Sequence, residues 1–290
     1  MNKKMKEKLI AYRHAPGSAI LALLVLLSAV LTFAVLLFLI GYILIHGVPY
    51  LSADLFAWEY NSENVSLLPA LVNTLIMTVM SLLIAVPLGV FSAIFLVEYA
   101  GKGNKFVEVI RLTTETLQGI PSIVYGLFGM LFFVKTMKWG TSLLAGAFTM
   151  SIMILPLIMR TTEEALKSVP DTFREGSFGL GAGKLRTIFR IVLPSAVPGI
   201  LAGVILAIGR VVGETAALMY TSGTVADVPK NVMGAGRTLA LHMYTLASEG
   251  LHTDKAYATA VILLILVILI NTMSSAIAKK ITKGNGNGEN

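Results

Sequence analysis

The sequence predicts an all-α fold: a polytopic membrane protein with six transmembrane helices. Hydrophobic residues make up 56% of its 290 residues. Charged residues make up only 13%, about half of the roughly 25% that is usual for soluble domains. Long uncharged runs also recur along the chain, and a helix needs about 20 such residues to cross a bilayer. One integral membrane domain is therefore expected.

The cysteine and histidine content excludes two kinds of site. With no cysteine, the chain has no disulfide framework and no thiolate metal site. The four histidines (His14, His46, His242 and His252) are scattered, and none forms a ligand pair at helical spacing. No nucleophile–base constellation is visible either. We therefore expect no enzyme, and no cofactor in this chain.

The first predicted element is a basic cytoplasmic N-terminus, residues 1–17, which holds five lysines and arginines. Residues 18–45 follow without a single charge and would form about 42 Å of helix. A signal peptide has an apolar core of only about 7–15 residues. Residues 18–45 are therefore predicted to be a retained, tilted transmembrane helix.

Five more apolar runs complete a six-span domain at residues 18–278. They cover residues 69–97, 112–134, 141–159, about 193–220 and 256–278. The last stretch, residues 279–290, begins with lysines and ends in a Gly- and Asn-rich sequence whose composition is typical of a flexible tail.

The positions of lysine and arginine predict the orientation of these spans. With the N-terminus inside, the inside segments hold 17 of the 23 lysines and arginines, and the outside segments hold 5. The remaining one, Arg210, lies within a span. Cytoplasmic loops carry the excess of basic residues in membrane proteins. Both termini and the loop at residues 160–192 are therefore expected in the cytoplasm, and no nucleic acid is needed to explain the net charge of +7.

That loop contains a regular pattern of small and charged residues. The pattern reads Glu175-Gly176-Ser177, three residues, Gly181, nine residues, then Ile191-Val192-Leu193-Pro194. A glycine between two amphipathic pieces favours a compact helix–turn–helix, because glycine adopts positive φ without a Cβ clash. The neighbouring glycines do not form an ATP-binding loop, since positions 178 and 185 fail the Walker A pattern.

The spacing resembles the signature loop of binding-protein-dependent ABC import permeases, which has two alanines where this chain has Gly176 and Ser177. The resemblance implies a type I ABC importer permease fold in a bacterial cytoplasmic membrane. It also implies that residues 160–192 are the coupling loop, in which Glu175, Gly176, Ser177, Gly181, Ile191, Leu193 and Pro194 serve contact with an ATPase.

Other stretches are similar to the phosphate-specific branch of that family, namely residues 160–166, Val169-Pro170 and residues 210–216. The resemblance implies inorganic phosphate as substrate. It also implies three kinds of partner: a second, unlike permease subunit, an ATPase dimer that binds ATP and Mg, and an external phosphate-binding protein. The residues alone leave two alternatives open. The substrate could be another oxyanion, such as sulfate or molybdate, or the chain could be a stand-alone channel or secondary transporter.

The third span is interrupted at Gly119-Ile120-Pro121-Ser122. Pro121 lacks a backbone donor and clashes with the preceding turn, so carbonyls near Leu117 should be left free. Such backbone is tolerated at membrane depth only inside protein or beside a water-filled cavity. The break predicts either a packing kink or a helix N-terminus at Ser122 that offers amides to an anion.

Arg210 and Glu214 are the other candidates for the substrate pathway. Arg210 is the only lysine or arginine inside a predicted span, and an arginine at the bilayer centre costs about 2.5–3.5 kcal/mol on insertion scales. A spacing of four residues would place Glu214 on the same helix face as Arg210. There Glu214 could merely neutralise the charge of Arg210, or it could compete with a passing anion for the arginine. Gly209 and Gly213 are expected to allow close helix packing. Residues 237–250 predict a short amphipathic helix on the outer face.

Overall fold

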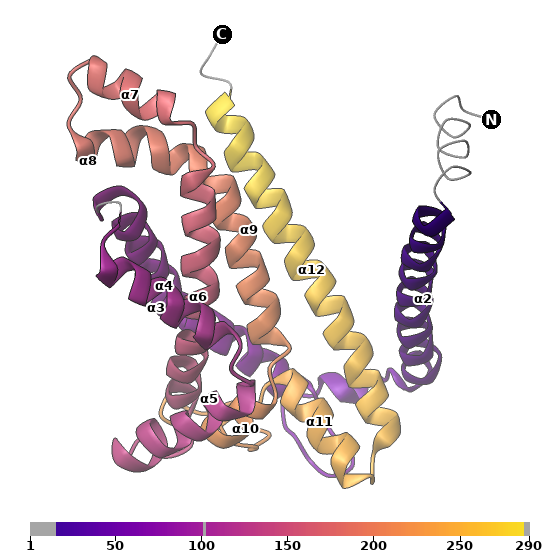
Figure 1. Cartoon of the computed structure of the whole chain (residues 1–290). Coiled ribbons are helices and arrows are strands. Elements are labelled where there is room, and N and C mark those ends of the chain that lie inside the picture. The colour runs from indigo at the N-terminus through magenta and orange to yellow at the C-terminus, as the bar shows by residue number, and fades with distance from the viewer. Residues whose placement is uncertain (1–15, 101–102, 287–290) are drawn as a thin grey trace.

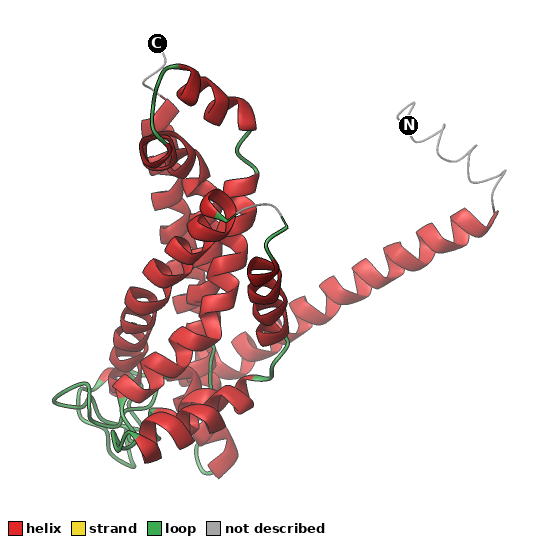
Figure 2. Cartoon of the chain, turned by 60° about the vertical axis from the view of Figure 1, so that its left-hand side comes forward, coloured by secondary structure: helices red, strands yellow, loops and turns green. Residues whose placement is uncertain are grey.

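The computed structural model describes residues 16–100 and 103–286, and within these ranges the chain consists of helices and loops (Figures 1 and 2). The main helices are α2 (Pro16–Gly47), α3 (Leu68–Ile94), α4 (Lys105–Gln118), α5 (Ser122–Gly129), α6 (Leu143–Lys167), α7 (Asp171–Gly179), α8 (Lys184–Thr187), α9 (Leu193–Val212), α10 (Ala216–Thr221), α11 (Leu239–Glu249) and α12 (Thr253–Gly286). Most of the predicted basic N-terminus, residues 1–15, lies outside the described residues.

Short segments of other helical types extend these helices. Three π-helical segments lie at Phe95–Tyr99, Met130–Thr136 and Ile188–Val192, where they continue α3 and α5 and join α8 to α9. Two 3₁₀ turns, Val48–Tyr50 and Ala53–Phe56, follow α2.

Five helical stretches of the described chain are long and apolar enough to cross a membrane. They cover residues 20–50, 68–99, 143–167, 184–212 and 253–276. The pair Lys105–Gln118 and Ser122–Thr136, bent by 103°, makes a sixth crossing when it is counted as one span. The predicted all-α membrane fold is confirmed, and its third span is the broken one.

The spans run between two ends of the bundle that differ in character (Figure 1). One end carries α7 and α8, together with the start of α2 and the end of α12 (the hairpin end). The opposite end carries α10, α11 and the loop between them (the loop end). In both views α2 stands away from the other helices along most of its length (Figures 1 and 2).

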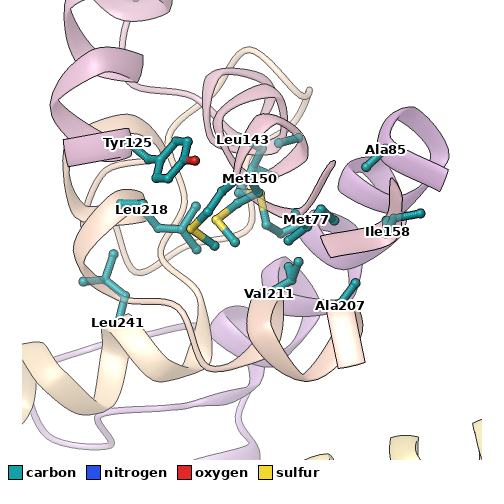
Figure 3. Close-up of a cluster of buried hydrophobic side chains, with 14 residues drawn as sticks. Met77, Ala85, Tyr125, Leu143, Met150, Ile158, Ala207, Val211, Leu218 and Leu241 are labelled. Atoms are coloured by element: carbon teal, nitrogen blue, oxygen red, sulfur yellow. The ribbon is translucent and has the colours of Figure 1, made fainter. Parts of the chain in front are cut away.

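The core of the bundle is an apolar cluster contributed mainly by α3, α6 and α9 (Figure 3). The cluster includes Met77, Met150 and Met153, together with Tyr125 of α5 and Leu218 of α10. Methionine suits such a place because its unbranched side chain fills irregular gaps. A second cluster, which includes Ile94, Leu166, Ile188 and Val192, packs the ends of α3, α6 and α9 against the hairpin.

One predicted boundary is wrong. The fifth span was expected to continue to about Tyr220, but α9 ends at Val212, and Gly213 caps it with a hydrogen bond from its amide to the carbonyl of Gly209. The chain then restarts as α10. At the C-terminus, α12 continues to Gly286 into the stretch where a tail was predicted, and residues 287–290 lie outside the described residues.

Candidate coupling hairpin and substrate pathway

The predicted turn of the coupling loop is present at Gly181. Helices α7 and α8 form a short hairpin, and Gly181 lies between them with φ of +80°. The turn is closed by bonds from the Gly181 amide to the Phe178 carbonyl (2.9 Å) and from the Ala182 amide to the Ser177 carbonyl (3.1 Å). An L-residue with a Cβ is strained at this φ, which explains the glycine.

The two residues that depart from the family pattern behave differently. Ser177 is buried, and its hydroxyl shares a 2.8 Å hydrogen bond with the Thr187 hydroxyl of α8, which ties the two helices together. Gly176 faces open space, since a Cβ there would meet no atom within 4 Å. Glu175 is exposed on α7. Ile191, Leu193 and Pro194 lie half-buried where the hairpin passes into α9.

The hairpin presents apolar side chains to its surroundings. Leu180, at the tip, is 92% exposed. Phe173, Phe178 and Leu185 are also exposed on α7 and α8. These four side chains are available for contact with another protein.

Arg174, which the sequence did not single out, fixes the hairpin to the bundle. Its Nε and Nη2 donate to Oε1 of Glu98, at 3.1 and 2.7 Å. Nη2 also donates to the Leu166 carbonyl (3.0 Å), and Nη1 donates to the Val169 carbonyl (2.9 Å) and to Oδ1 of Asp171 (3.1 Å). These five bonds match the five N–H donors of a guanidinium. Arg174 therefore links α7 to the ends of both α6 and α3.

Further charges connect α4 to α6 at the same end. Nε of Arg111 lies 2.7 Å from Oε1 of Glu163, and Nζ of Lys167 lies 2.5 Å from the same oxygen. Glu163 is largely buried by these partners, with a side chain 12% exposed. Arg111, Lys167 and Arg174 border a cavity of about 680 Å³ at the hairpin end.

At the break in the third span, the Leu117 carbonyl finds hydrogen-bond donors within the chain. Pro121 leaves the Leu117 carbonyl without its helical donor, and the Tyr125 hydroxyl donates a 2.8 Å hydrogen bond to that oxygen. The same oxygen also accepts a 3.2 Å hydrogen bond from the Ile120 amide, so this carbonyl is not left free, contrary to the prediction from the sequence. The break also creates a new helix start at Ser122, which is half-buried, after the exposed Pro121.

Arg210 lies beside this break. It belongs to the last turn of α9, and its guanidinium is close enough to the Tyr125 side chain for an electrostatic interaction. Helix α5 also packs tightly on the segment that follows α9, because Gly126 contacts the backbone of Ala216 and Ala217. The broken third span therefore meets the segment that follows Arg210.

The expected pairing of Glu214 with Arg210 is wrong. Because α9 ends at Val212, the two residues do not share a helix face. Glu214 is 8% exposed, and its Oε1 accepts a 3.1 Å hydrogen bond from the Ala217 amide at the start of α10. Among the ion pairs of the described residues, none joins Arg210 to a carboxylate.

The close packing expected at Gly209 and Gly213 is also not found in this chain. A Cβ on Gly209 would meet no atom within 4 Å, and one on Gly213 would meet only the Gly209 carbonyl, at 3.5 Å. The tight contacts of α9 occur about two and three turns earlier, where a Cβ on Gly203 would overlap Thr161 and one on Gly199 would overlap Ala165.

The segment between α10 and α12 packs into the loop end rather than lying loosely on it. Carbonyls of Val232 and Gly234 accept hydrogen bonds from the Leu144 and Leu143 amides at the start of α6 (2.9 and 3.0 Å). The predicted short helix is α11, whose His242 is fully buried. This favours a packing role for α11 over a free docking surface.

His242 lies in a small aromatic and cationic cluster at the loop end. Its ring meets the Tyr60 ring edge-on at 6.1 Å between centroids, and the Arg237 guanidinium lies over the same Tyr60 ring at 4.8 Å. Burial, together with the charge of Arg237, lowers the pKa of His242 to about 3. The imidazole is therefore neutral over the physiological pH range.

These features define an integral membrane subunit: several apolar spans, one of them broken at Pro121, and a helical hairpin projecting from one end. The chain belongs to the family described as "Binding-protein-dependent transport system inner membrane component", which matches residues 85–284. It is thus a permease of ABC importers, in which ATP hydrolysis resides in a separate subunit.

Relatives extend the match along the chain. A "Probable ABC transporter permease protein YqgI" of Bacillus subtilis is 33% identical over 97% of this chain and 99% of its own length. A "Phosphate transport system permease protein PstA 1" of Mycobacterium tuberculosis is 38% identical over 72% of this chain and 69% of its own. The corresponding PstA of Pasteurella multocida is 34% identical over 78% and 81%.

Solved structures agree in fold. A chain of a bacterial alginate ABC transporter, crystallised with an alginate pentasaccharide-bound periplasmic protein, matches with a TM-score of 0.69 and 16% identity. That match covers 94% of this chain and 98% of the other. A chain of the MetNI methionine ABC transporter in an inward-facing conformation matches with a TM-score of 0.57 and 19% identity over 83% and 97%.

Proposed function

We propose that this chain is one permease subunit of an ATP-driven importer that moves inorganic phosphate inward across a bacterial cytoplasmic membrane. The observation that carries the proposal is Arg210, a guanidinium at the end of α9 that no carboxylate of the described residues neutralises. Phosphate carries one to two negative charges near neutral pH and enters an apolar passage only with compensation. The planar fork of arginine suits phosphate oxygens as a lysine ammonium does not.

The break beside Arg210 adds a second feature suited to an anion. Helix α5 begins at Ser122 after Pro121, and the first amides of a helix have no intrahelical acceptor. An anion held by Arg210 would lie near these residues, because Gly126 of α5 packs against Ala216 and Ala217, which follow Arg210 closely in the chain. The relatives named as phosphate transport system permeases support phosphate among the oxyanions.

Coupling to ATP is assigned to the α7–α8 hairpin. Its exposed apolar side chains, with Leu180 at the tip, would enter a groove of the ATPase, so that closure of the ATPase dimer moves the spans. This places the hairpin end in the cytoplasm, which agrees with the excess of lysine and arginine there. ATP and Mg would be bound by the ATPase dimer.

Two further partners complete the importer. A second, unlike permease subunit would supply the other half of the passage. An external phosphate-binding protein would deliver the substrate at the loop end. The crystal structure of a bacterial alginate ABC transporter in complex with a periplasmic protein supports the second of these partners.

The test is substrate-dependent ATP hydrolysis and uptake by the assembled transporter in proteoliposomes. Phosphate with its binding protein should stimulate both, whereas sulfate and molybdate should stimulate neither. Stimulation by sulfate or molybdate in place of phosphate would assign another oxyanion. Uptake by the chain without an ATPase would assign a channel or secondary transporter and remove the coupling role of the hairpin.

A further inference from the structure

The covalent chain joins the α7–α8 hairpin to only two of the spans. Residues 168–170 connect α6 to α7, and the π-helical segment Ile188–Val192 connects α8 to α9. A movement of the hairpin therefore reaches α6 and α9 directly. Any other span must receive it through side chains.

Arg174 supplies such a connection to α3. The two bonds that it makes to Glu98 are largely shielded from water, because the side chains of Arg174 and Glu98 are 15% and 8% exposed. Its bonds to the Leu166 and Val169 carbonyls hold the guanidinium in one orientation. A charged pair with this geometry is stronger and more directional than an exposed ion pair.

A second contact supports the first. Nζ of Lys184, the first residue of α8, lies 4.9 Å from the centroid of the Tyr99 ring. Glu98 and Tyr99 are neighbours in the π-helical segment that ends α3. Both helices of the hairpin therefore hold the same end of α3. Such π-helical turns are frequent at functional positions.

The other end of α3 is bonded to the loop end. Nδ2 of Asn73 donates to the carbonyls of Asp227 (3.1 Å) and Arg237 (3.2 Å). The Thr74 hydroxyl accepts from the Leu239 amide at 2.8 Å. Between these contacts and Glu98 lie about 25 residues of helix, or roughly 37 Å. One helix therefore has hydrogen bonds to the hairpin at one end and to the outer segment at the other.

We propose that α3 is the element that transmits movement of the hairpin to the outer segment, residues 222–239, and that the Arg174–Glu98 pair is the joint through which α3 receives it. This rests on the coupling role proposed for the hairpin above. Arg174 and Glu98 are positioning residues, since neither touches substrate. Through this connection, a movement of the hairpin at the ATPase side would be accompanied by a movement of residues 222–239 at the side that receives the binding protein.

Replacement of one acidic partner of Arg174 at a time tests the joint in the complete transporter. Glu98→Gln removes the charge that holds α3 and leaves Arg174 and its carbonyl bonds in place. The matched control is Asp171→Asn. It removes the other carboxylate that bonds to Arg174, which is 85% exposed and lies within α7.

Glu98→Gln should lower the amount of substrate moved per ATP by about two- to thirty-fold, the range for mutations in coupling networks. Asp171→Asn should stay within about twofold, as expected for an exposed ion pair, and Glu98→Asp should restore most of the loss. Equal effects of Glu98→Gln and Asp171→Asn would overturn the joint.

A distance measurement keeps the proposal testable if Glu98→Gln does not assemble. The chain has no cysteine, so spin labels on introduced cysteines report unambiguously. One pair joins the hairpin tip to α3 (Gly183→Cys and Leu83→Cys), and a second joins the tip to α12 (Gly183→Cys and Leu269→Cys); all three sites are exposed, and a Cβ on Gly183 would meet no atom within 4 Å.

On trapping with ATP and vanadate, the tip-to-α12 distance should change while the tip-to-α3 distance stays fixed. A change in the tip-to-α3 distance of the same size would overturn the joint. No change in either pair would overturn the coupling role of the hairpin, and the joint with it. These readouts do not depend on which anion is carried, so a failure of the phosphate assignment would leave them unaffected.

Discussion

The Tyr125 hydroxyl donates a hydrogen bond to the Leu117 carbonyl across the break between α4 and α5. In a continuous helix this oxygen would accept from residue 121, which is a proline and has no amide hydrogen. The bend of 103° therefore leaves no unpaired Leu117 carbonyl. The geometry of the break therefore depends on the Tyr125 side chain.

Substitution of Arg210 tests the proposed pathway. Arg210→Lys keeps the charge but loses the planar fork, so phosphate uptake should fall while assembly is normal. Arg210→Gln should reduce uptake by about 30-fold or more, since loss of one partner from a charged, hydrogen-bonded pair costs about 2–5 kcal/mol. Uptake of labelled phosphate by proteoliposomes measures both. Arg160→Gln, which breaks a surface pair with Glu164, is the control. Normal uptake by Arg210→Gln would show that Arg210 has only a structural role.

Glu214 is expected to act as a cap and not as a counter-ion. Glu214→Gln keeps an oxygen that can accept from the Ala217 amide, so its thermal stability should be close to that of the parent. Glu214→Ala removes the acceptor and should lower the free energy of unfolding by about 0.5–2 kcal/mol, the usual cost of losing a helix cap. Thermal unfolding in detergent compares the variants. If Gln were as destabilising as Ala, the charge of Glu214 would matter and the capping explanation would be wrong.

Gly181 is expected to set the angle of the hairpin. Gly181→Val forces a β-branched residue to a φ of +80°, a strain of about 1–3 kcal/mol. The variant should insert normally and yet hydrolyse ATP without transport. Gly183→Val adds the same side chain where φ is −74° and no atom lies within 4 Å, and it should retain coupling. The ratio of phosphate imported to ATP hydrolysed is the measurement. Equal ratios for the two variants would argue against strain at Gly181.

His242 predicts a loss of stability in acid. Its folded-state pKa of about 3 lies below the usual value of 6.5, so the unfolded chain binds a proton first as the pH falls. The free energy of unfolding should therefore decline below pH 6.5, by about 2 kcal/mol at pH 5. Unfolding of His242→Gln should lack this part of the pH dependence. Thermal unfolding at pH 7.5, 6 and 5 compares the two proteins. Parallel pH profiles would mean that His242 is protonated in the folded state.

The isolated chain is expected neither to transport phosphate nor to stimulate an ATPase. The reason is geometric, because one subunit of this size would line only half of a passage between two permeases. Reconstitution with the ATPase and the binding protein, with and without a second permease subunit, is the measurement. Activity with this chain as the sole membrane subunit would contradict the requirement for an unlike partner.

Local features of the fold were predictable from sequence because their causes are local. The turn at Gly181 follows from one glycine between two amphipathic pieces, and the break at Pro121 follows from a missing amide hydrogen. Both are found where the sequence placed them. Long uncharged runs likewise predicted the spans, since the bilayer sets a minimum length.

Relationships between distant residues were not predictable from one sequence. Glu98 precedes Arg174 by 76 residues, and nothing in the spacing indicates that they bond. The prediction for Glu214 was wrong because helical spacing was extended past Gly213, which ends α9. Gly199 and Gly203 repeat the same four-residue spacing as Gly209 and Gly213. Only the position of α6 decides which pair packs closely.

The isolation of α2 has a consequence for how the first crossing behaves in a bilayer. Helix α2 meets α12 near Gly47, where Tyr257 and Val261 occupy the space of a Cβ, while its apolar side chains are exposed along most of its length. Lipid tails are as apolar as leucine, so these side chains lose little by facing lipid. Most of the surface of α2 is therefore available to lipid or to the second permease subunit, and the helix is fixed to the rest of the described chain mainly at the end near Gly47.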